Sequence, residues 1–201
     1  MISLYSYINE GIFDVDDNIE NIDKSIKDQI KQFLKDNFKG ASSCKISHKP
    51  NTDGKYEVSS SKNIKAKNEK ITSLTNNMFI WTNVDGNFYC GWCESLASLE
   101  GAPKEVGGDF YCSDCNSLTS LKGAPKEVGG DFKCWMCDSL TSLEGAPEKV
   151  GNFYCSHCYS LTSLKGAPKE VDGVFRCWGC KIKFTEEDVK KVSKVGGNIQ
   201  V

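Results

Sequence analysis

The sequence predicts an α+β solenoid, in which short parallel strands stack coil upon coil between an N-terminal and a C-terminal cap. A unit of 21 or 22 residues recurs along most of the chain. Each unit begins with a phenylalanine, at Phe88, Phe110, Phe132, Phe153 and Phe175. A unit of this length cannot bury its own apolar face, whereas stacked copies can bury a continuous core.

The apolar positions within one unit indicate how the chain runs. In the unit 110–131 the first apolar step is two residues, from Phe110 to Cys112, as in a β-strand. The following steps are three residues, which suits a chain that turns around a core. Gly-Ala-Pro at 123–125 and Gly-Gly-Asp at 129–131 are turn sequences. The one shorter unit lacks a residue at Gly151-Asn152, and this deletion falls in a predicted turn.

The phrase Cys-x-Ser-Leu-Thr-Ser-Leu, at 115–121 and again from Cys137 and Cys158, resembles the leucine-rich repeats of the BspA-like class. The resemblance covers roughly 63–201 and implies a leucine-rich-repeat-like solenoid with a parallel sheet of short strands. The chain departs from that class by a second cysteine three residues earlier and by Cys-x-x-Leu in place of Asn-x-Leu. The array also looks like uncharacterised repeat proteins of crAss-like gut bacteriophages, which implies a phage-encoded protein of the host cytoplasm or the virion.

The composition divides the chain into an N-terminal cap (1–62), the repeat solenoid (63–184) and a C-terminal cap (185–201). In the first part, apolar residues at helical spacing predict a helix over 17–38. Alternating residues on either side of the segment 51–54 predict a β-hairpin. Residues 63–74 form a degenerate first unit, in which Asn68 stands at the place of the second cysteine.

The C-terminal cap is predicted from helix signals. Thr185 is expected to cap a helix whose first turn is acidic. Val189 and Val192 should face inward, Gly-Gly at 196–197 should end the helix, and 198–201 should add a last strand.

Composition excludes several classes of function. The formal net charge is −2, so no global positive field attracts nucleic acid or an acidic membrane. No apolar run reaches the roughly 20 residues of a membrane span. The segment Met1–Glu10 lacks the pattern of a secretory signal, so the eleven cysteines are expected in a reducing environment. Within the same N-terminal region, Leu4–Gly11 looks like a capsid-targeting peptide of tailed phages. The alternative is a short helix that packs on the cap.

Five Cys-x-x-Cys pairs recur, one in each unit: Cys90/Cys93, Cys112/Cys115, Cys134/Cys137, Cys155/Cys158 and Cys177/Cys180. Taken alone, their spacing fits a zinc ribbon. Stacked coils instead favour ladders of buried thiols about 4.8 Å apart, which do not converge on one ion. We therefore expect structural cysteines and no cofactor, with a zinc-binding module as the alternative. The single Cys44 is expected to be buried, His48 to be exposed, and His157 not to bind metal.

The positions that vary between units predict a binding site. They follow the phenylalanine, lie between the cysteines or follow the second cysteine, and strand alternation places them on the outer face. The candidate binding residues are Tyr89, Trp92, Tyr111, Asp114, Lys133, Trp135, Met136, Tyr154, His157, Arg176 and Trp178. Aromatic residues, Met and Arg are enriched at protein interfaces, although aromatic residues also favour strands for their own sake.

No catalytic motif is present: there is no phosphate-binding loop, nucleophile elbow or His-Glu-x-x-His. The sequence therefore predicts a non-enzymatic repeat protein that binds another protein through its outer strand face. Alternatives are the zinc-binding module and a virion decoration or cargo protein whose array only supplies shape.

Overall fold

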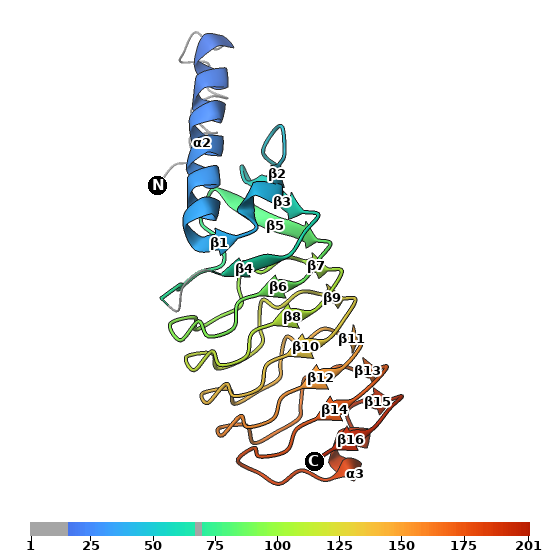
Figure 1. Cartoon of the computed structure of the whole chain (residues 1–201). Coiled ribbons are helices and arrows are strands. Elements are labelled where there is room, and N and C mark those ends of the chain that lie inside the picture. Colours follow the sequence, from blue (N-terminus) through green and yellow to red (C-terminus); the bar gives the residue numbers. More distant parts are fainter. Residues whose placement is uncertain (1–15, 67–69) are drawn as a thin grey trace.

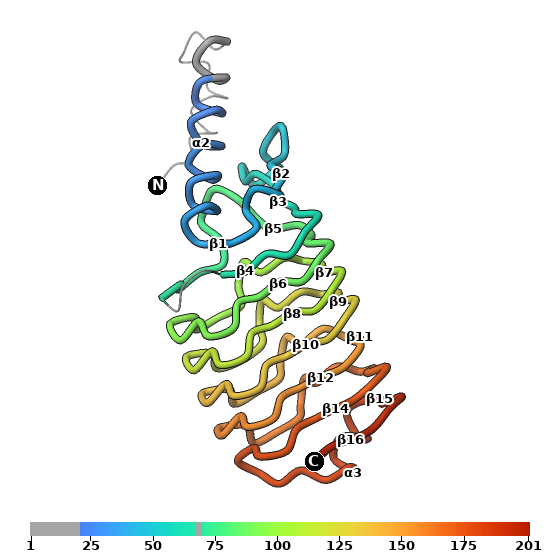
Figure 2. The backbone as a smooth tube through the Cα atoms, in the orientation of Figure 1, coloured from blue at the N-terminus to red at the C-terminus, as the bar shows by residue number. Residues whose placement is uncertain are grey.

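The computed structural model describes residues 16–66 and 70–201, and over these it is a solenoid of stacked coils with parallel strands (Figure 1). Helix α2 (Asp16–Asn37) stands at the N-terminal end, and the short helix α3 (Glu186–Lys190) lies at the other end. The backbone tube advances by one coil per repeat from the N-terminal to the C-terminal end of the array (Figure 2). The predicted mixed α+β solenoid is confirmed.

One sheet runs the length of the array and begins each unit. Its neighbours are parallel from β4 onward, and each phenylalanine pairs with the phenylalanine of the next coil. Within the described residues its strands are β1 (Phe38–Lys39), β4 (Ile64–Ala66), β6 (Phe88–Tyr89), β8 (Phe110–Tyr111), β10 (Phe132–Lys133), β12 (Phe153–Tyr154), β14 (Phe175–Arg176) and β16 (Ile199–Gln200). β16 is the last strand that the sequence predicts, and β1 joins as an antiparallel edge.

A second strand in each coil was not predicted from the sequence. It precedes the Gly-Gly-Asp turn, where the chain pairs in parallel with the neighbouring coils. The strands of the predicted hairpin, β2 (Cys44–Ile46) and β3 (Tyr56–Ser60), begin this side. The strands that were not predicted are β5 (Phe79–Val84), β7 (Glu105–Val106) and β9 (Glu127–Val128), followed by β11 (Lys149–Val150), β13 (Glu170–Val171) and β15 (Lys194–Val195). The first five strands of this side form one sheet and the last three another.

The missing residue of the fourth coil explains why this side is split between β9 and β11. In an intact coil the amide of Gly129 donates to the carbonyl of Val106 at 2.9 Å, and Gly130 donates to Gly108 at 3.0 Å. In the shortened coil Gly151 donates to Gly130 at 2.8 Å. Gly151 therefore takes the place of the second glycine, and the chain before it is shifted out of register with β9.

The core is a set of ladders inside the coils. The phenylalanines that begin the units are completely buried, and neighbouring rings lie 5.2 to 5.7 Å apart between centroids. The two leucines of each Ser-Leu-x-Ser-Leu segment are buried beneath them. At the N-terminal end Trp81 contacts both Phe38 and Phe88 edge-on, and its indole N–H donates to the carbonyl of Leu74 at 2.8 Å. Aromatic packing thus joins the cap to the first coils.

The N-terminal cap forms the predicted helix and hairpin. Ile30 and Leu34 of α2 are buried, as the apolar stripe predicts. In the hairpin Cys44 pairs with Ser60 and Ile46 with Val58, and a short 3₁₀ turn (Ala41–Ser43) leads into it. β3 then pairs in parallel with β5, so the hairpin extends the second side of the solenoid. The positions of Asn68 and of the segment Leu4–Gly11 lie outside the described residues.

At the C-terminal end the predicted cap of α3 is confirmed. The Thr185 side chain accepts a bond from the Asp188 amide while Asp188 binds the Thr185 amide, and Val189 is buried. The expectation that Gly-Gly at 196–197 ends the helix is wrong. The helix ends at Lys190, and β15 lies in between. The Gly196 amide donates to the carbonyl of Val171 at 2.8 Å, so this pair forms the same corner as the glycines of the other coils.

Candidate binding face

The residues that follow the phenylalanines form a ladder of aromatic and cationic side chains, which we call the strand row. It comprises Tyr89, Tyr111, Lys133, Tyr154 and Arg176, and all five are half-buried. The rings of Tyr89 and Tyr111 stack with centroids 4.5 Å apart. Since the phenylalanine on one side of each position points inward, these side chains point outward, as strand alternation predicts.

Lys133 is held by its neighbours in the strand row. Its Nζ lies 2.9 Å from Oδ2 of both Asp109 and Asp131 and donates to the Tyr111 hydroxyl at 2.9 Å. It also lies over the rings of Tyr111 and Tyr154, at 4.4 and 5.7 Å from their centroids. Burial opposes the charge of Lys133, but the hydrogen bonds that its ammonium donates to Tyr111, Asp109 and Asp131 outweigh this effect and raise its pKa. The charge of Lys133 is therefore neutralised within the protein.

Arg176 differs from Lys133 because it has no acidic partner. Its guanidinium lies 5.2 Å from the ring centroid of Tyr154, and its Nε donates to the Gln200 amide oxygen at 2.5 Å. In the described part of the chain no carboxylate lies within ion-pair distance of it. Arg176 thus supplies an uncompensated positive charge to this face.

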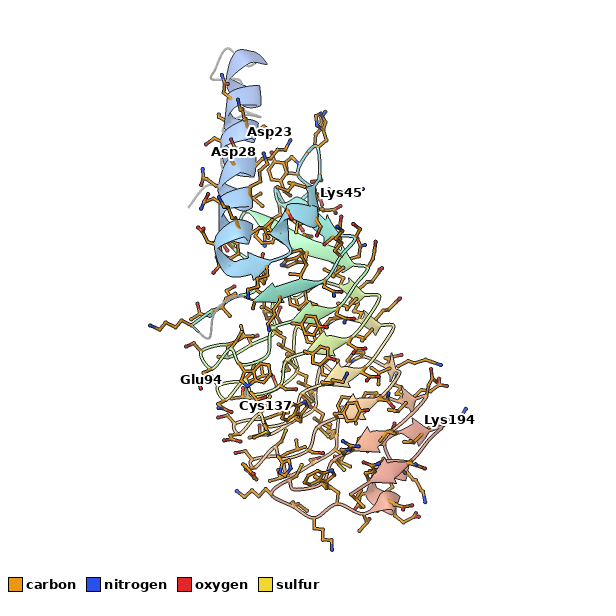
Figure 3. The ribbon with its side chains drawn as sticks, viewed as in Figure 1. Asp23, Asp28, Lys45, Glu94, Cys137 and Lys194 are labelled. Carbon is orange, nitrogen blue, oxygen red and sulfur yellow. The ribbon has the colours of Figure 1, made fainter. Side chains whose placement is uncertain are left out.

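The residue before the second cysteine has the left-handed backbone conformation in every coil. Its φ is 55° at Trp92, 59° at Asp114, 55° at Met136, 56° at His157 and 72° at Gly179. A residue with a Cβ is disfavoured there by roughly 1–2 kcal/mol. The sequence carried little sign of this turn, because glycine occurs there only at Gly179, and Trp92 and Met136 are residue types that rarely adopt this conformation. Figure 3 labels Glu94, which follows the second cysteine of its unit, at the left edge of the array, and Lys194 of β15 at the right edge, on the second side.

A cleft lies on the outer face over β10, β12 and β14. Its volume is about 520 Å³, and it is lined by Lys133, Trp135, Met136, Tyr154, Ser156, His157, Arg176 and Trp178. Seven of these eight are candidate binding residues from the sequence. The remaining candidates lie on the two preceding coils, outside the cleft: Tyr89, Trp92, Tyr111 and Asp114. Ser156 also lines the cleft. It occupies a variable position between the two cysteines but is not one of the eleven candidate binding residues.

No protein-family profile, curated protein or solved structure matches the chain significantly. The geometry of the face therefore carries the functional argument.

The cysteines form ladders inside the coils. From the second Cys-x-x-Cys unit onward, the thiol of the second cysteine donates to the carbonyl of the first cysteine one coil earlier, as Cys115 does to Cys90 at 3.1 Å and Cys137 to Cys112 at 3.2 Å. Cys158 and Cys180 repeat this bond at 3.2 Å each. None of the eleven cysteines, all of which lie within the described residues, forms a disulfide. A thiol that donates a hydrogen bond is neutral, whereas a metal ligand must be a thiolate.

Burial favours the neutral form of these thiols. It raises the pKa of Cys115 and of Cys158 to about 12 and that of Cys180 to about 11. Over 16–66 and 70–201, no group of three or more His, Cys, Asp or Glu side chains is placed to hold a metal ion. Cys44 is half-buried rather than buried, because it lies on the edge strand β2, and burial raises its pKa to about 11.

The two histidines occupy different surroundings. His48 is exposed in the hairpin, as predicted, and its carbonyl accepts a hydrogen bond from Lys27 at 2.7 Å. His157 packs edge-on against Trp178, with the ring centroids 4.2 Å apart. His157 therefore forms part of the cleft wall.

A larger hollow, of about 930 Å³, lies on the second side over β7, β9 and β11. It is lined by the Gly-Ala-Pro turns and the Glu-Val strands, and it has no aromatic lining residue. These positions hardly change from coil to coil. A surface of near-identical repeats offers little that is specific to one partner, so we place the candidate site in the cleft on the first side.

Among the described helices, none is long and apolar enough to cross a bilayer.

Proposed function

We propose that this chain is a non-enzymatic recognition protein that binds another protein through its outer strand face. The observation that carries the proposal is the cleft over β10, β12 and β14, where seven of the sequence-variable residues converge on an otherwise repetitive framework. A framework that keeps its core residues and varies one face is the usual arrangement of binding solenoids.

The composition of the face supports protein binding. Trp92, Met136 and Trp178 are 59%, 38% and 44% exposed, which is unusual for such large apolar side chains. Aromatic residues, Met and Arg dominate the energetics of protein interfaces, particularly where they line a pocket. The second side of the solenoid presents mainly Glu and Lys at the corresponding strand positions, which is typical of a solvated surface.

The resemblance of the repeats to those of phage proteins supports a role in an infected bacterial cell or in a virion. In the competing interpretation the array is a decoration or cargo protein that contributes only its shape. The two interpretations differ in one respect: only recognition requires the particular side chains of the outer face.

The discriminating variant carries Trp92→Gly, Trp135→Ser and Trp178→Ser. Glycine suits the left-handed position of Trp92, and serine is the residue that Ser113 and Ser156 supply at the other two positions. A matched control carries Lys104→Gln, Lys126→Gln and Glu127→Gln on the second side, where all three side chains are exposed.

The measurement is quantitative mass spectrometry of proteins captured from the native source, alongside circular dichroism of each variant. We expect the wild type and the control to enrich the same protein, and the face variant to lose it without any loss of folding. Capture of the same proteins by all three chains would favour the decoration interpretation.

A further inference from the structure

The coil of β12 contributes a small side chain between two large ones. Counted from the first cysteine of each unit, Ser156 occupies the position that Trp135 holds in the preceding coil and Trp178 in the following coil. Two strand spacings separate the coils that bear the tryptophans by about 9.6 Å. One flat side chain in contact with a ring on each side needs roughly 7–8 Å. His157 of the middle coil already packs edge-on against Trp178, with ring centroids 4.2 Å apart, so a planar group that enters the cleft would stack on the Trp135 side.

The floor of the cleft holds a polar group without a partner. The Ser156 side chain is 4% exposed, and its hydroxyl has no hydrogen-bond partner in the described structure. The Ser113 hydroxyl is also unpartnered, but Ser113 lies outside the cleft, so a buried serine alone does not define a site. Beside Ser156 the cleft adds the guanidinium of Arg176, whose charge is uncompensated. The Ser156 hydroxyl can donate a hydrogen bond and the Arg176 guanidinium carries a positive charge, so the two groups together suit an anion.

The remaining lining indicates which kind of anion fits. None of the eight lining residues is a carboxylate, so the hydroxyl groups of a sugar would find few acceptors. The charge of Lys133 is already neutralised by Asp109 and Asp131, which leaves one cation and not the cluster that a polyphosphate requires. The other lining residues are mostly aromatic or apolar. A single carboxylate next to a planar apolar group matches this lining.

We propose that the cleft binds a short peptide segment of the partner in which an aromatic side chain is adjacent to an acidic residue. The ring packs against Trp135 over Ser156, beside the His157–Trp178 pair, and the carboxylate accepts hydrogen bonds from Arg176 and the Ser156 hydroxyl. This inference rests on the proposed function and deepens it, because it specifies the chemistry of the partner.

The test uses the full chain labelled with ¹⁵N at its tryptophans and the probe acetyl-Ala-Asp-Phe-Asp-Ala-amide. The indole N–H signals of Trp135 and Trp178 should shift with added peptide. Those of Trp92, on the same face but outside the cleft, and Trp81, buried in the core, should stay in place. Two control peptides replace both Asp by Asn, or Phe by Ala, and each should bind at least about fivefold more weakly.

Matched variants connect the effect to the named residues. Arg176→Gln should weaken the probe about tenfold, because it removes the charge-assisted hydrogen bond. Ser156→Trp should abolish binding by filling the cleft. Ser113→Trp makes the same change one coil before the cleft and should leave binding unchanged, which also shows that a coil tolerates tryptophan at this position.

Several results would overturn the proposal: no shift at millimolar peptide, equal binding of the Asn peptide, equal shifts at Trp92, or tighter binding of methyl glucuronide or adenosine monophosphate than of the probe. If the peptide fails while the triple face variant still loses its captured protein, protein recognition stands and only the assigned chemistry falls. If neither effect is seen, both proposals fall.

Discussion

At the scale of single residues, the left-handed position before the second cysteine is the costliest feature of the coil. Four of the five coils place a residue with a Cβ there, although Gly179 shows that glycine fits. Each such residue costs roughly 1–2 kcal/mol relative to its normal conformation. Backbone strain that persists is often associated with function. Here the side chains of Trp92, Met136 and His157 project from a sharp turn on the outer face. Met136 and His157 line the cleft of the proposed site.

Asp114 is the one residue of this set that has a carboxylate in a partly buried position, and we predict that Asp114→Asn stabilises the protein. Its Oδ2 atom is buried without a hydrogen-bond partner. Burial, and then repulsion by Asp138, raises the pKa of the Asp114 carboxyl. Asparagine removes the charge and tolerates the same backbone conformation. We expect the free energy of unfolding, measured by urea denaturation at pH 7, to rise by about 0.5–1 kcal/mol, a modest gain because solvent partly screens the group.

The same pKa shift predicts how this gain depends on pH. A carboxyl whose pKa is raised by folding binds its proton more tightly in the folded state, so ionisation costs stability. The cost begins as pH rises past the unfolded value, near 3.8, and is complete above the folded value. The advantage of Asp114→Asn should therefore vanish near pH 3. Asp138→Asn, at an exposed position, serves as control and should gain less. An equal advantage at pH 3 and pH 7 would contradict the explanation.

At the scale of elements, a ladder of Asn and Asp side chains ties the coils together at the turn before each phenylalanine. A side-chain oxygen accepts a hydrogen bond from the backbone amide of the equivalent residue one coil later. The bonds are Asn63 to Asn87 at 2.8 Å, Asn87 to Asp109 at 2.7 Å, Asp109 to Asp131 at 2.8 Å, Asp131 to Asn152 at 3.1 Å and Asn152 to Val174 at 2.5 Å. The side chain of Val174 has no hydrogen-bond acceptor, so the ladder ends there.

We predict that Asn152→Ala destabilises the protein by about 1–3 kcal/mol. Asn152 both accepts from the Val174 amide and donates to the Asp131 carboxylate at 2.7 Å, and its loss leaves a half-buried amide without this acceptor. Val174→Ala is the matched control, because Val174 is half-buried in the same turn but makes no side-chain hydrogen bond. Urea unfolding of the two variants measures the difference. A control as destabilised as Asn152→Ala would argue for packing instead of the ladder.

The elements that the sequence predicted are those with a repeated or directional signal. The Phe-x-Cys strand, the cap hairpin and the Thr185 cap all have one, and all are present. The second strand of each coil escaped prediction because it is two residues long and buries only one of them, such as Val128. Two residues cannot display an alternation, so only the pairing of neighbouring coils reveals the strand. The error at 196–197 has the same origin, since those glycines follow such a strand.

At the scale of the whole molecule, the outer face was predictable and the cleft was not. Variable positions and strand alternation identify the eleven candidate residues without any structure. The cleft depends on which coil lies beside which, because Ser156 forms its floor only when Trp135 and Trp178 stand on either side. The contrast between Lys133 and Arg176 likewise depends on Asp109 and Asp131 being stacked beside the lysine.

The stability of a solenoid is approximately a sum of its coils and the interfaces between them, so one weak interface affects the whole array. The missing residue of the fourth coil produces such an interface, because the β9 and β11 strands do not pair. The first sheet remains continuous there through β10 and β12. The two halves of the molecule are therefore joined on one side of the coil and interrupted on the other.

We predict that inserting one glycine between Gly151 and Asn152 restores the pairing of β9 with β11. Gly151 would then donate to the Val128 carbonyl, as Gly129 donates to Val106, and the added glycine would donate to Gly130. Each recovered hydrogen bond contributes about 1 kcal/mol, and ordering the extra residue offsets much of this. The clearer readout is amide hydrogen exchange, which should slow at Glu148, because its counterpart Lys126 donates to the Lys104 carbonyl at 2.8 Å in an intact coil. The urea transition should also become sharper. The control inserts a glycine between Gly129 and Gly130 of an intact coil, where it should loosen the array. If both insertions speed exchange alike, the missing residue is not what separates the two sheets.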